Sequence, residues 1–501
     1  MSASTGLQNQ RGRTVKGWLR SLGSSTIGVA GARLGTFLNA AILARILGAH
    51  GLGQYSTAWS TISLFSSIAM LGIHTATART TAHLRACDRR DLSEQLANAL
   101  LLAGGASAIV MMVPLLAGDA IARGFLHSAD FGPLLRLAAW NVPLLALFQV
   151  TLSILQGFED FRAYRQSLVW SSVLLVPITF MLGRAKGTFG ALVALLVANL
   201  LGLAISGTLV LRCFRRNGVH LAWRANWASM KAILRLSLPL SLSSWVAELA
   251  WWLGNLYLAR TRGFTQVSYY AAGFAVFQAL QLLPMAVSVP ALPALTAHIA
   301  RNDQPGYGRL LSLTIRGVWA VALPACAVVC AFATPICVHL LGPSYAPAAG
   351  ALRWMALAGL MSAVCGLFGP AFVSTGRTWA LLGLSLTWFA LICAFGLLLI
   401  PGGAAGMAKA VLAAYTALAL LAGSLCNRHL RPRFLRLLAA LVCLMGAAYT
   451  LIQYVSHLTL AAMLAGCIAW ALVGFAVSGM IVLNAEERHL LIGGFFRQAR
   501  S

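Results

Sequence analysis

The sequence has little charge and very few acidic side chains. Of its 501 residues, 10% are charged and 11 are Asp or Glu, whereas a soluble domain carries about 25% charged residues. This scarcity excludes an ordinary soluble protein. The chain is instead rich in apolar residues, which make up 59% of it and give a mean hydropathy of +0.80. Because helices satisfy their own backbone groups in lipid, the composition predicts an all-α polytopic membrane protein.

Patterns typical of enzymes and of metal or nucleic-acid binding are missing as well. No Walker A motif occurs, because the run Lys186–Gly187–Thr188 has the wrong order for one. The 10 His residues show no metal-ligand spacing, and the 10 Cys residues lie mostly in apolar runs as small hydrophobic side chains. The net charge of +26 comes from cations in short loops, which is a topology signal. We therefore expect no enzyme activity, metal, cofactor or nucleic-acid partner.

Fourteen apolar stretches are long enough for membrane spans, which need about 20 mainly apolar residues. They lie near residues 18–47, 55–80, 95–117, 134–157, 167–183, 188–211, 236–260, 267–293, 313–339, 351–375, 379–400, 408–427, 437–455 and 459–483. The first is too long for the core of a cleavable signal peptide and is expected to be retained. With the N-terminus in the cytoplasm, 27 of the 37 Lys and Arg residues fall on the cytoplasmic side and nine on the other. This bias predicts that both termini are cytoplasmic.

The longest and most basic connection divides the chain into two lobes. The predicted organisation is a cytoplasmic tail at 1–17, an N-lobe at 18–211, a basic cytoplasmic connection at 212–235, a C-lobe at 236–427, two further spans at 437–483 and a cytoplasmic tail at 484–501. Because six spans per lobe give both copies the same orientation, we expect a pseudo-two-fold axis along the membrane normal.

The opening spans of the two lobes match at an offset of 215 residues. Seven identities occur over the 23 positions 33–55, and the most specific are Arg45/Arg260, Gly48/Gly263 and Tyr55/Tyr270. The same offset carries Arg33 onto Glu248, and both are predicted near the middle of a span. The sequence therefore predicts a duplicated bundle with opposite charges at matched positions, which is typical of a transporter with a central polar path.

Arg33 and Glu248 are the leading site candidates because a charge at the bilayer centre costs at least about 2.5–3.5 kcal/mol on insertion scales. The guanidinium of Arg33 suits an anionic group such as phosphate, which it binds through charge-assisted hydrogen bonds. Glu248 either pairs with Arg33 in the empty state or takes a proton in a coupled cycle. The structural alternative is a salt bridge that only fastens span 1 to span 7.

Further polar and aromatic residues are candidates for sugar contacts. Asn255 lies seven residues after the span 7 carboxylate, on the same helix face. Trp251 and Trp252 flank that face, where their rings can stack on a sugar. In span 8, Gln278 and Gln281 either bond sugar hydroxyls or bond neighbouring helices.

Four short motifs, taken in order, resemble the Wzx-type polysaccharide flippase family. They are LARILGAHGLGQY at 43–55, LQGFEDFRAY at 155–164, LGPSY at 341–345 and STGR at 374–377. This family belongs to the multidrug/oligosaccharidyl-lipid/polysaccharide exporter superfamily. Many relatives have an acidic residue near the end of span 7, where this chain reads Gly254–Asn255–Leu256. Glu248 is the residue here that can substitute for it.

The resemblance implies two six-helix lobes around a central cavity, with two further C-terminal helices. It also implies a flippase that moves undecaprenyl-diphosphate-linked oligosaccharide between leaflets of a bacterial inner membrane by alternating access. That activity serves exopolysaccharide or O-antigen (lipopolysaccharide) assembly, with membrane lipids, a polysaccharide polymerase and assembly proteins as expected partners. Two alternatives remain open, a small-molecule or drug exporter of the same superfamily and a membrane glycan polymerase or glycosyltransferase.

Overall fold

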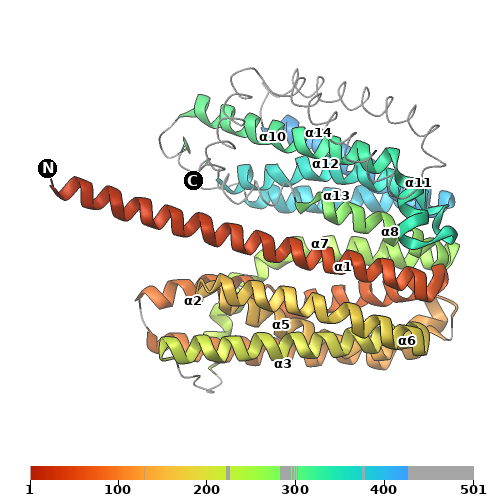
Figure 1. Ribbon diagram of the computed structural model, residues 1–501, viewed down its shortest axis with the longest axis horizontal. Coiled ribbons are helices and arrows are strands. Elements are labelled where there is room, and N and C mark those ends of the chain that lie inside the picture. The colour runs from red at the N-terminus through yellow and green to blue at the C-terminus, as the bar shows by residue number, and fades with distance from the viewer. Residues whose placement is uncertain are drawn as a thin grey trace. The chain divides into compact units, whose positions relative to one another are not determined.

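The computed structural model describes residues 2–426, apart from gaps at 88, 129, 220, 222–225, 283–294, 296–297, 300, 302 and 375–377, and also describes Gly466. The predicted spans at 437–455 and 459–483 and the C-terminal tail therefore lie outside the described residues, Gly466 excepted. All regular elements in the described part are helices, and Figure 1 shows them as long rods. The predicted all-α membrane fold is confirmed. The total of fourteen spans stays a prediction.

The chain forms two compact units, and the first covers Met1–Arg260. Its elements are α1 (Ser2–Met70), α2 (Ile73–Cys87), α3 (Arg89–Ala120), the π-helix η1 (Ile121–Phe125), α4 (Phe131–Ala139), α5 (Asn141–Gly157), α6 (Phe161–Asn217) and nearly all of α7 (Trp227–Arg262). The long helix α6 packs along α1, and α5 packs against α2, α3 and α6. In Figure 1, α1 is the long red helix that begins at the N-terminus.

The second unit covers Thr261–Ser501. Its described elements are α8 (Phe264–Leu280), α10 (Gln304–Ala331), α11 (Ala333–Ile336), the π-helix η2 (Cys337–Leu341), η3 (Pro343–Tyr345), α12 (Ala348–Ser374), α13 (Thr378–Leu399), η4 (Ile400–Gly402) and α14 (Gly403–Cys426). Helix α12 is the centre of this unit, since it packs against α8, α10 and α14. The lobe boundaries expected from the sequence, with a connection at 212–235, stay a proposal.

Six helices of the described part are long and apolar enough to cross a membrane. They are Leu92–Phe125, Phe131–Gly157, Phe161–Asn217, Gln304–Ala331, Ala348–Gly366 and Leu382–Ala422. The bent pair Gly35–Met70 and Ile73–Ala82, whose two parts are bent by 47°, makes a seventh if it is counted as one span. Two of the six, Phe161–Asn217 and Leu382–Ala422, each contain two of the spans expected from the sequence, joined by a tight turn.

The internal repeat extends well beyond the residues that reveal it in the sequence. Gly48 (φ 67°, ψ −175°) and Gly263 (φ 82°, ψ 168°) have the same unusual backbone conformation at the end of the first span of each half. Gly187 (φ 58°, ψ −139°) and Gly403 (φ 63°, ψ −142°) repeat this at an offset of 216. The π-helices Ile121–Phe125 and Cys337–Leu341 share the offset of 216. The two halves of the chain therefore share the same helix breaks at matched positions.

Glycine is required at the matched tight turns for two reasons. A positive φ is readily adopted by glycine and costs energy for other residues. A second glycine follows three residues after Gly187 and after Gly403. A Cβ at Gly190 would collide with the carbonyl of Leu182, and a Cβ at Gly406 would collide with that of Leu399. Each turn is thus closed by direct contact of a glycine with the backbone of the preceding helix.

Candidate functional site

Side chains of α7 meet the second half of α1 in a row that we name the α1–α7 seam. Three hydrogen bonds form it: from Ser63 Oγ to Glu248 Oε2 (2.9 Å), from Trp252 Nε1 to Thr61 Oγ1 (3.1 Å) and from Trp245 Nε1 to the Ser67 carbonyl (2.8 Å). Both helices belong to the first compact unit. The seam therefore joins residues that are about 180 positions apart in the sequence.

Helical spacing explains why one face of α7 supplies all three contacts. Trp245, Glu248 and Trp252 are separated by three and four residues, so they lie above one another on one face. The residue numbers of their partners fall from 67 to 63 to 61 along α1 as the numbers on α7 rise. The two segments therefore run antiparallel. Beyond the end of the row, the break between α1 and α2 nearly touches α7, because a Cβ on Gly72 would lie 2.6 Å from the Ser237 carbonyl.

The break after α1 creates the acceptor for Trp245. The last carbonyls of a helix have no partner within it. Here Leu71 adopts a positive φ of 46° and donates its N–H to Ile68 instead of Ser67. The Ser67 carbonyl is then filled by the indole of Trp245 at 2.8 Å. The bend that splits the predicted second span is thereby tied to α7.

Glu248 is half-buried in the middle of α7, and its carboxylate accepts a hydrogen bond from the span 2 hydroxyl of Ser63. A carboxylate in a membrane span is costly unless a donor, a cation or a proton compensates its charge. It can exchange such partners, so it is able to bind a polar substrate group or a proton. The binding or coupling role expected of Glu248 stays a prediction.

The other predicted site residues are placed as follows. Asn255 lies on α7, and its Oδ1 is buried without a hydrogen-bond partner in the described part of the chain. Trp251 is half-buried on the same helix. Gln278 lies in α8 and Gln281 directly after it, both in the second unit, and Gln281 Nε2 is likewise buried without a partner among the described atoms.

Arg33 belongs to helix α1, but its side chain lies outside the described residues. The expected pairing of Arg33 with Glu248 therefore stays a prediction. The structure brings together Glu248 and Trp252, and it adds three residues that sequence reasoning missed: Thr61, Ser63 and Trp245. The only sequence signal for Thr61 and Ser63 was the density of Ser and Thr in the second span, which is common in membrane helices that bond their neighbours.

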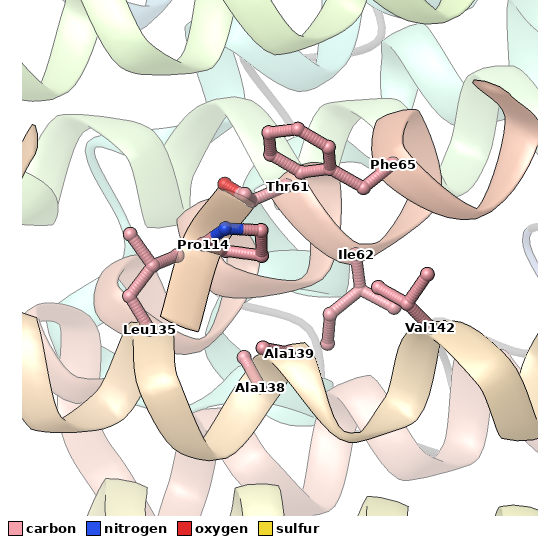
Figure 2. A pocket seen from close by; sticks show the side chains of 8 residues that line it. All are labelled: Thr61, Ile62, Phe65, Pro114, Leu135, Ala138, Ala139 and Val142. Atoms are coloured by element: carbon pink, nitrogen blue, oxygen red, sulfur yellow. The ribbon is translucent and has the colours of Figure 1, made fainter. Parts of the chain in front are cut away.

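An apolar pocket lies next to the seam. Figure 2 shows its lining, which comes from α1 (Thr61, Ile62, Phe65), α3 (Pro114) and the α4–α5 segment (Leu135, Ala138, Ala139, Val142). Its empty volume is about 150 Å³, part of which is open to the outside, and no part of it is wide enough to admit a water molecule. Thr61 is its one polar side chain, and its hydroxyl donates to the Thr57 carbonyl while accepting from Trp252. The pocket is therefore a packing gap and not a sugar site.

Metal binding has no support in the part of the chain that is described, where no group of three His, Cys, Asp or Glu side chains is placed to hold an ion. The polar groups of the α1–α7 seam are hydroxyls, indoles and one carboxylate.

Comparison with known proteins places the chain in a family. The sequence profile of the family described as "polysaccharide biosynthesis protein" matches residues 18–296. This chain belongs to that family. No curated protein sequence matches it. The expected kinship with Wzx-type proteins is thereby confirmed at the level of the family.

Solved structures with the same fold are transporters of the MOP superfamily. The lipid II flippase MurJ in an inward closed conformation has a TM-score of 0.72 at 14% identity, with 91% of this chain and 98% of that chain covered. An inward-facing multidrug resistance MATE transporter has a TM-score of 0.68 at 16% identity, with 83% and 99% covered. A MOP superfamily transporter from Pyrococcus furiosus, with a binding pocket described as of reverse polarity, has a TM-score of 0.62 at 16% identity, with 83% and 96% covered.

These likenesses establish the fold of this polysaccharide biosynthesis family member as that of a multi-pass membrane transporter. At such low identity they carry no information on its substrate. The substrate has to be argued from the family and from the residues of the chain.

Proposed function

We propose that this protein is a flippase that moves undecaprenyl-diphosphate-linked oligosaccharide from the cytoplasmic to the periplasmic leaflet. The observation that carries the proposal is Glu248, a carboxylate held in the α1–α7 seam of a polysaccharide biosynthesis family member. It lies in a segment that the sequence predicts to span the membrane. Lipid-linked sugar is the intermediate of polysaccharide synthesis that has to cross a membrane. A lipid II flippase has the same fold, so this architecture is compatible with the movement of a lipid-linked substrate.

The proposed cycle assigns a role to each candidate residue. Arg33 attracts the diphosphate, because a guanidinium binds phosphate through two parallel hydrogen bonds. Glu248 binds a substrate group or a proton through its carboxylate, and it is the candidate coupling residue. The remaining candidates contact the sugar by stacking or amide hydrogen bonds: Trp251, Trp252, Asn255, Gln278 and Gln281. The lobes then alternate between inward-open and outward-open states.

The cellular setting follows from the same proposal. The protein lies in a bacterial inner membrane with both termini in the cytoplasm, and it serves exopolysaccharide or lipopolysaccharide assembly. Its lobes are residues 18–211 and 236–427, joined by the basic connection at 212–235. A polysaccharide polymerase and other assembly proteins receive the flipped product. The protein moves its substrate without changing a covalent bond.

A drug exporter is the second candidate function, and the likeness to a multidrug resistance MATE transporter favours it. A charge argument favours the flippase. Exporters of organic cations use acidic cavities, whereas this chain has 11 acidic residues among 501, and Arg33 lies in its first predicted span. A membrane glycan polymerase is the enzymatic alternative, and the short loops expected from the sequence leave it no large external domain.

The test combines complementation in cells with transport by purified protein. A deletion strain is restored with wild type, Arg33→Ala, Glu248→Ala or the control Arg262→Ala, which removes an exposed cation at the end of α7. We expect wild type and the control to restore surface polysaccharide. Arg33→Ala and Glu248→Ala are expected to accumulate lipid-linked sugar in the inner leaflet at equal membrane levels of protein.

In proteoliposomes, wild-type protein is expected to expose a labelled lipid-linked oligosaccharide to an external glycosidase. Export of a cationic dye without movement of the lipid-linked sugar would replace the flippase with a drug exporter. Formation of longer glycans by the purified protein would replace it with a polymerase. Full surface polymer from both single variants would remove Arg33 and Glu248 from the mechanism.

A further inference from the structure

We propose that Ser63 is a positioning residue that orients the carboxylate of Glu248 for the transport step. The inference rests on the proposed function, because it assigns a role within the same site. Ser63 lies on α1 and Glu248 on α7, and the hydroxyl donates to Oε2 at 2.9 Å. Ser63 acts on the carboxylate, and contact with the substrate is left to Glu248.

The hydroxyls around Ser63 behave differently from it. A serine or threonine in a helix commonly bonds a carbonyl three or four residues earlier. Thr57 donates to the Gly53 carbonyl, and Ser60 and Thr61 both donate to the Thr57 carbonyl, each at 2.9 Å. Ser63 instead donates across to another helix. Its hydroxyl is therefore committed to Glu248 while its neighbours on α1 satisfy their own backbone.

Two tryptophans hold α7 in the rotation that brings the carboxylate to Ser63. Trp245 lies three residues before Glu248 and Trp252 four residues after it, so both flank the carboxylate on one helix face. Trp245 is fixed by the Ser67 carbonyl at 2.8 Å and Trp252 by Thr61 at 3.1 Å. Because both indoles are anchored to α1, the rotation of α7 about its own axis is set on each side of Glu248.

The carboxylate gains a defined direction from this arrangement. A carboxylate has two acceptor oxygens, and Ser63 occupies Oε2. Oε1 has no partner in the described part of the chain and is left to meet a substrate group or a proton. A hydrogen bond to a charged acceptor is shorter and about twice as strong as a neutral one. Ser63 thus keeps Oε2 bound while Oε1 is free to bind a substrate group or a proton.

The first arm of the test compares three single variants in proteoliposomes that carry labelled lipid-linked oligosaccharide. Ser63→Ala is expected to slow flipping about tenfold, since it removes a hydrogen bond to a charged group. Ser63→Thr keeps the hydroxyl and is expected to restore the rate. The matched control is Ser60→Ala, one turn away, which removes a hydroxyl that bonds only its own helix. We expect it to flip at nearly the wild-type rate.

The second arm asks whether Ser63 acts through Glu248. In a Glu248→Gln background, Ser63→Ala is expected to cost less than about threefold, because contacting residues show non-additive effects. Thermal melting of wild type, Ser63→Ala, Glu248→Gln and the double variant gives a second double-mutant cycle that does not depend on flipping. Equal loss from Ser63→Ala in both backgrounds, in rate and in melting, would overturn the inference and leave Ser63 with a packing role.

The two proposals fail in different ways. Wild-type protein that does not flip lipid-linked oligosaccharide contradicts the proposed function, whatever Ser63 does. Active wild type with Ser63→Ala and Ser60→Ala both at the wild-type rate overturns only the positioning role. A slow Ser63→Ala that Ser63→Thr fails to restore also overturns it, because the hydroxyl is then not the group that matters.

Discussion

Replacing Gly157 with alanine tests how closely α2 and α5 pack in the first unit. Gly157 closes α5 within the LQGFEDFRAY motif. A Cβ placed there would collide with Thr81 Cβ, and it would lie 2.8 Å from Thr81 Cγ2 and 3.0 Å from the Ala78 carbonyl. Ordinary carbon contacts are about 3.5–4.0 Å. The two helices therefore have to move apart by roughly 1 Å to admit one methyl group.

The energetic balance follows from two opposing effects. Overpacking a tight interior costs about 1–3 kcal/mol, whereas glycine to alanine at a position that accepts the side chain gains about 0.4–1 kcal/mol. We expect Gly157→Ala to be less stable than wild type by about 1–2 kcal/mol. The control is Gly105→Ala in α3, where a Cβ would meet nothing within 4 Å; there only the gain applies.

Unfolding by sodium dodecyl sulfate in mixed micelles, followed by tryptophan fluorescence, measures both variants. The control should match wild type or exceed it, and Gly157→Ala should unfold at lower detergent fraction. Removing the side chain opposite, with Thr81→Gly in the same protein, should relieve part of the loss. If Gly157→Ala proved as stable to detergent unfolding as Gly105→Ala, the close packing of α2 on α5 would be refuted.

Two further predictions concern the second unit. Arg353→Ala should lower the melting temperature, because Arg353 donates to the Cys330 carbonyl (3.2 Å) near the end of α10 and to Thr334 Oγ1 (3.2 Å). The control is Arg309→Ala, which removes an exposed side chain of α10 and should leave the melting temperature unchanged. The pKa of Asp303 lies below its ordinary value because it accepts hydrogen bonds from the Gly306 N–H and from His298. The stability this carboxylate adds is then present above its ordinary pKa and lost as pH falls through the lower folded value. The melting difference between wild type and Asp303→Ala should therefore be full near pH 6 and shrink below about pH 4; a difference independent of pH would contradict this role.

The family and the all-α fold were predictable because hydropathy and short motifs are local properties. A run of about 20 apolar residues predicts a membrane span whatever its tertiary contacts are. The motifs at 43–55 and 155–164 show the family resemblance in their amino-acid sequence alone. The repeat was predictable only from its first two spans. The rest of it is carried by backbone geometry, as at Gly187 and Gly403, where a positive φ is matched but little of the surrounding sequence is.

The sequence by itself determined that Glu248 is a carboxylate in an apolar span, because the residue type and the apolar residues on either side are local properties of the sequence. The tertiary structure alone decided that Ser63, 185 residues away, is its partner. A helix surrounded by lipid and protein is apolar on every side, so its pattern does not reveal which face meets which neighbour. Rotation and pairing are set by packing between distant segments, and the α1–α7 seam exists only once α1 and α7 lie side by side.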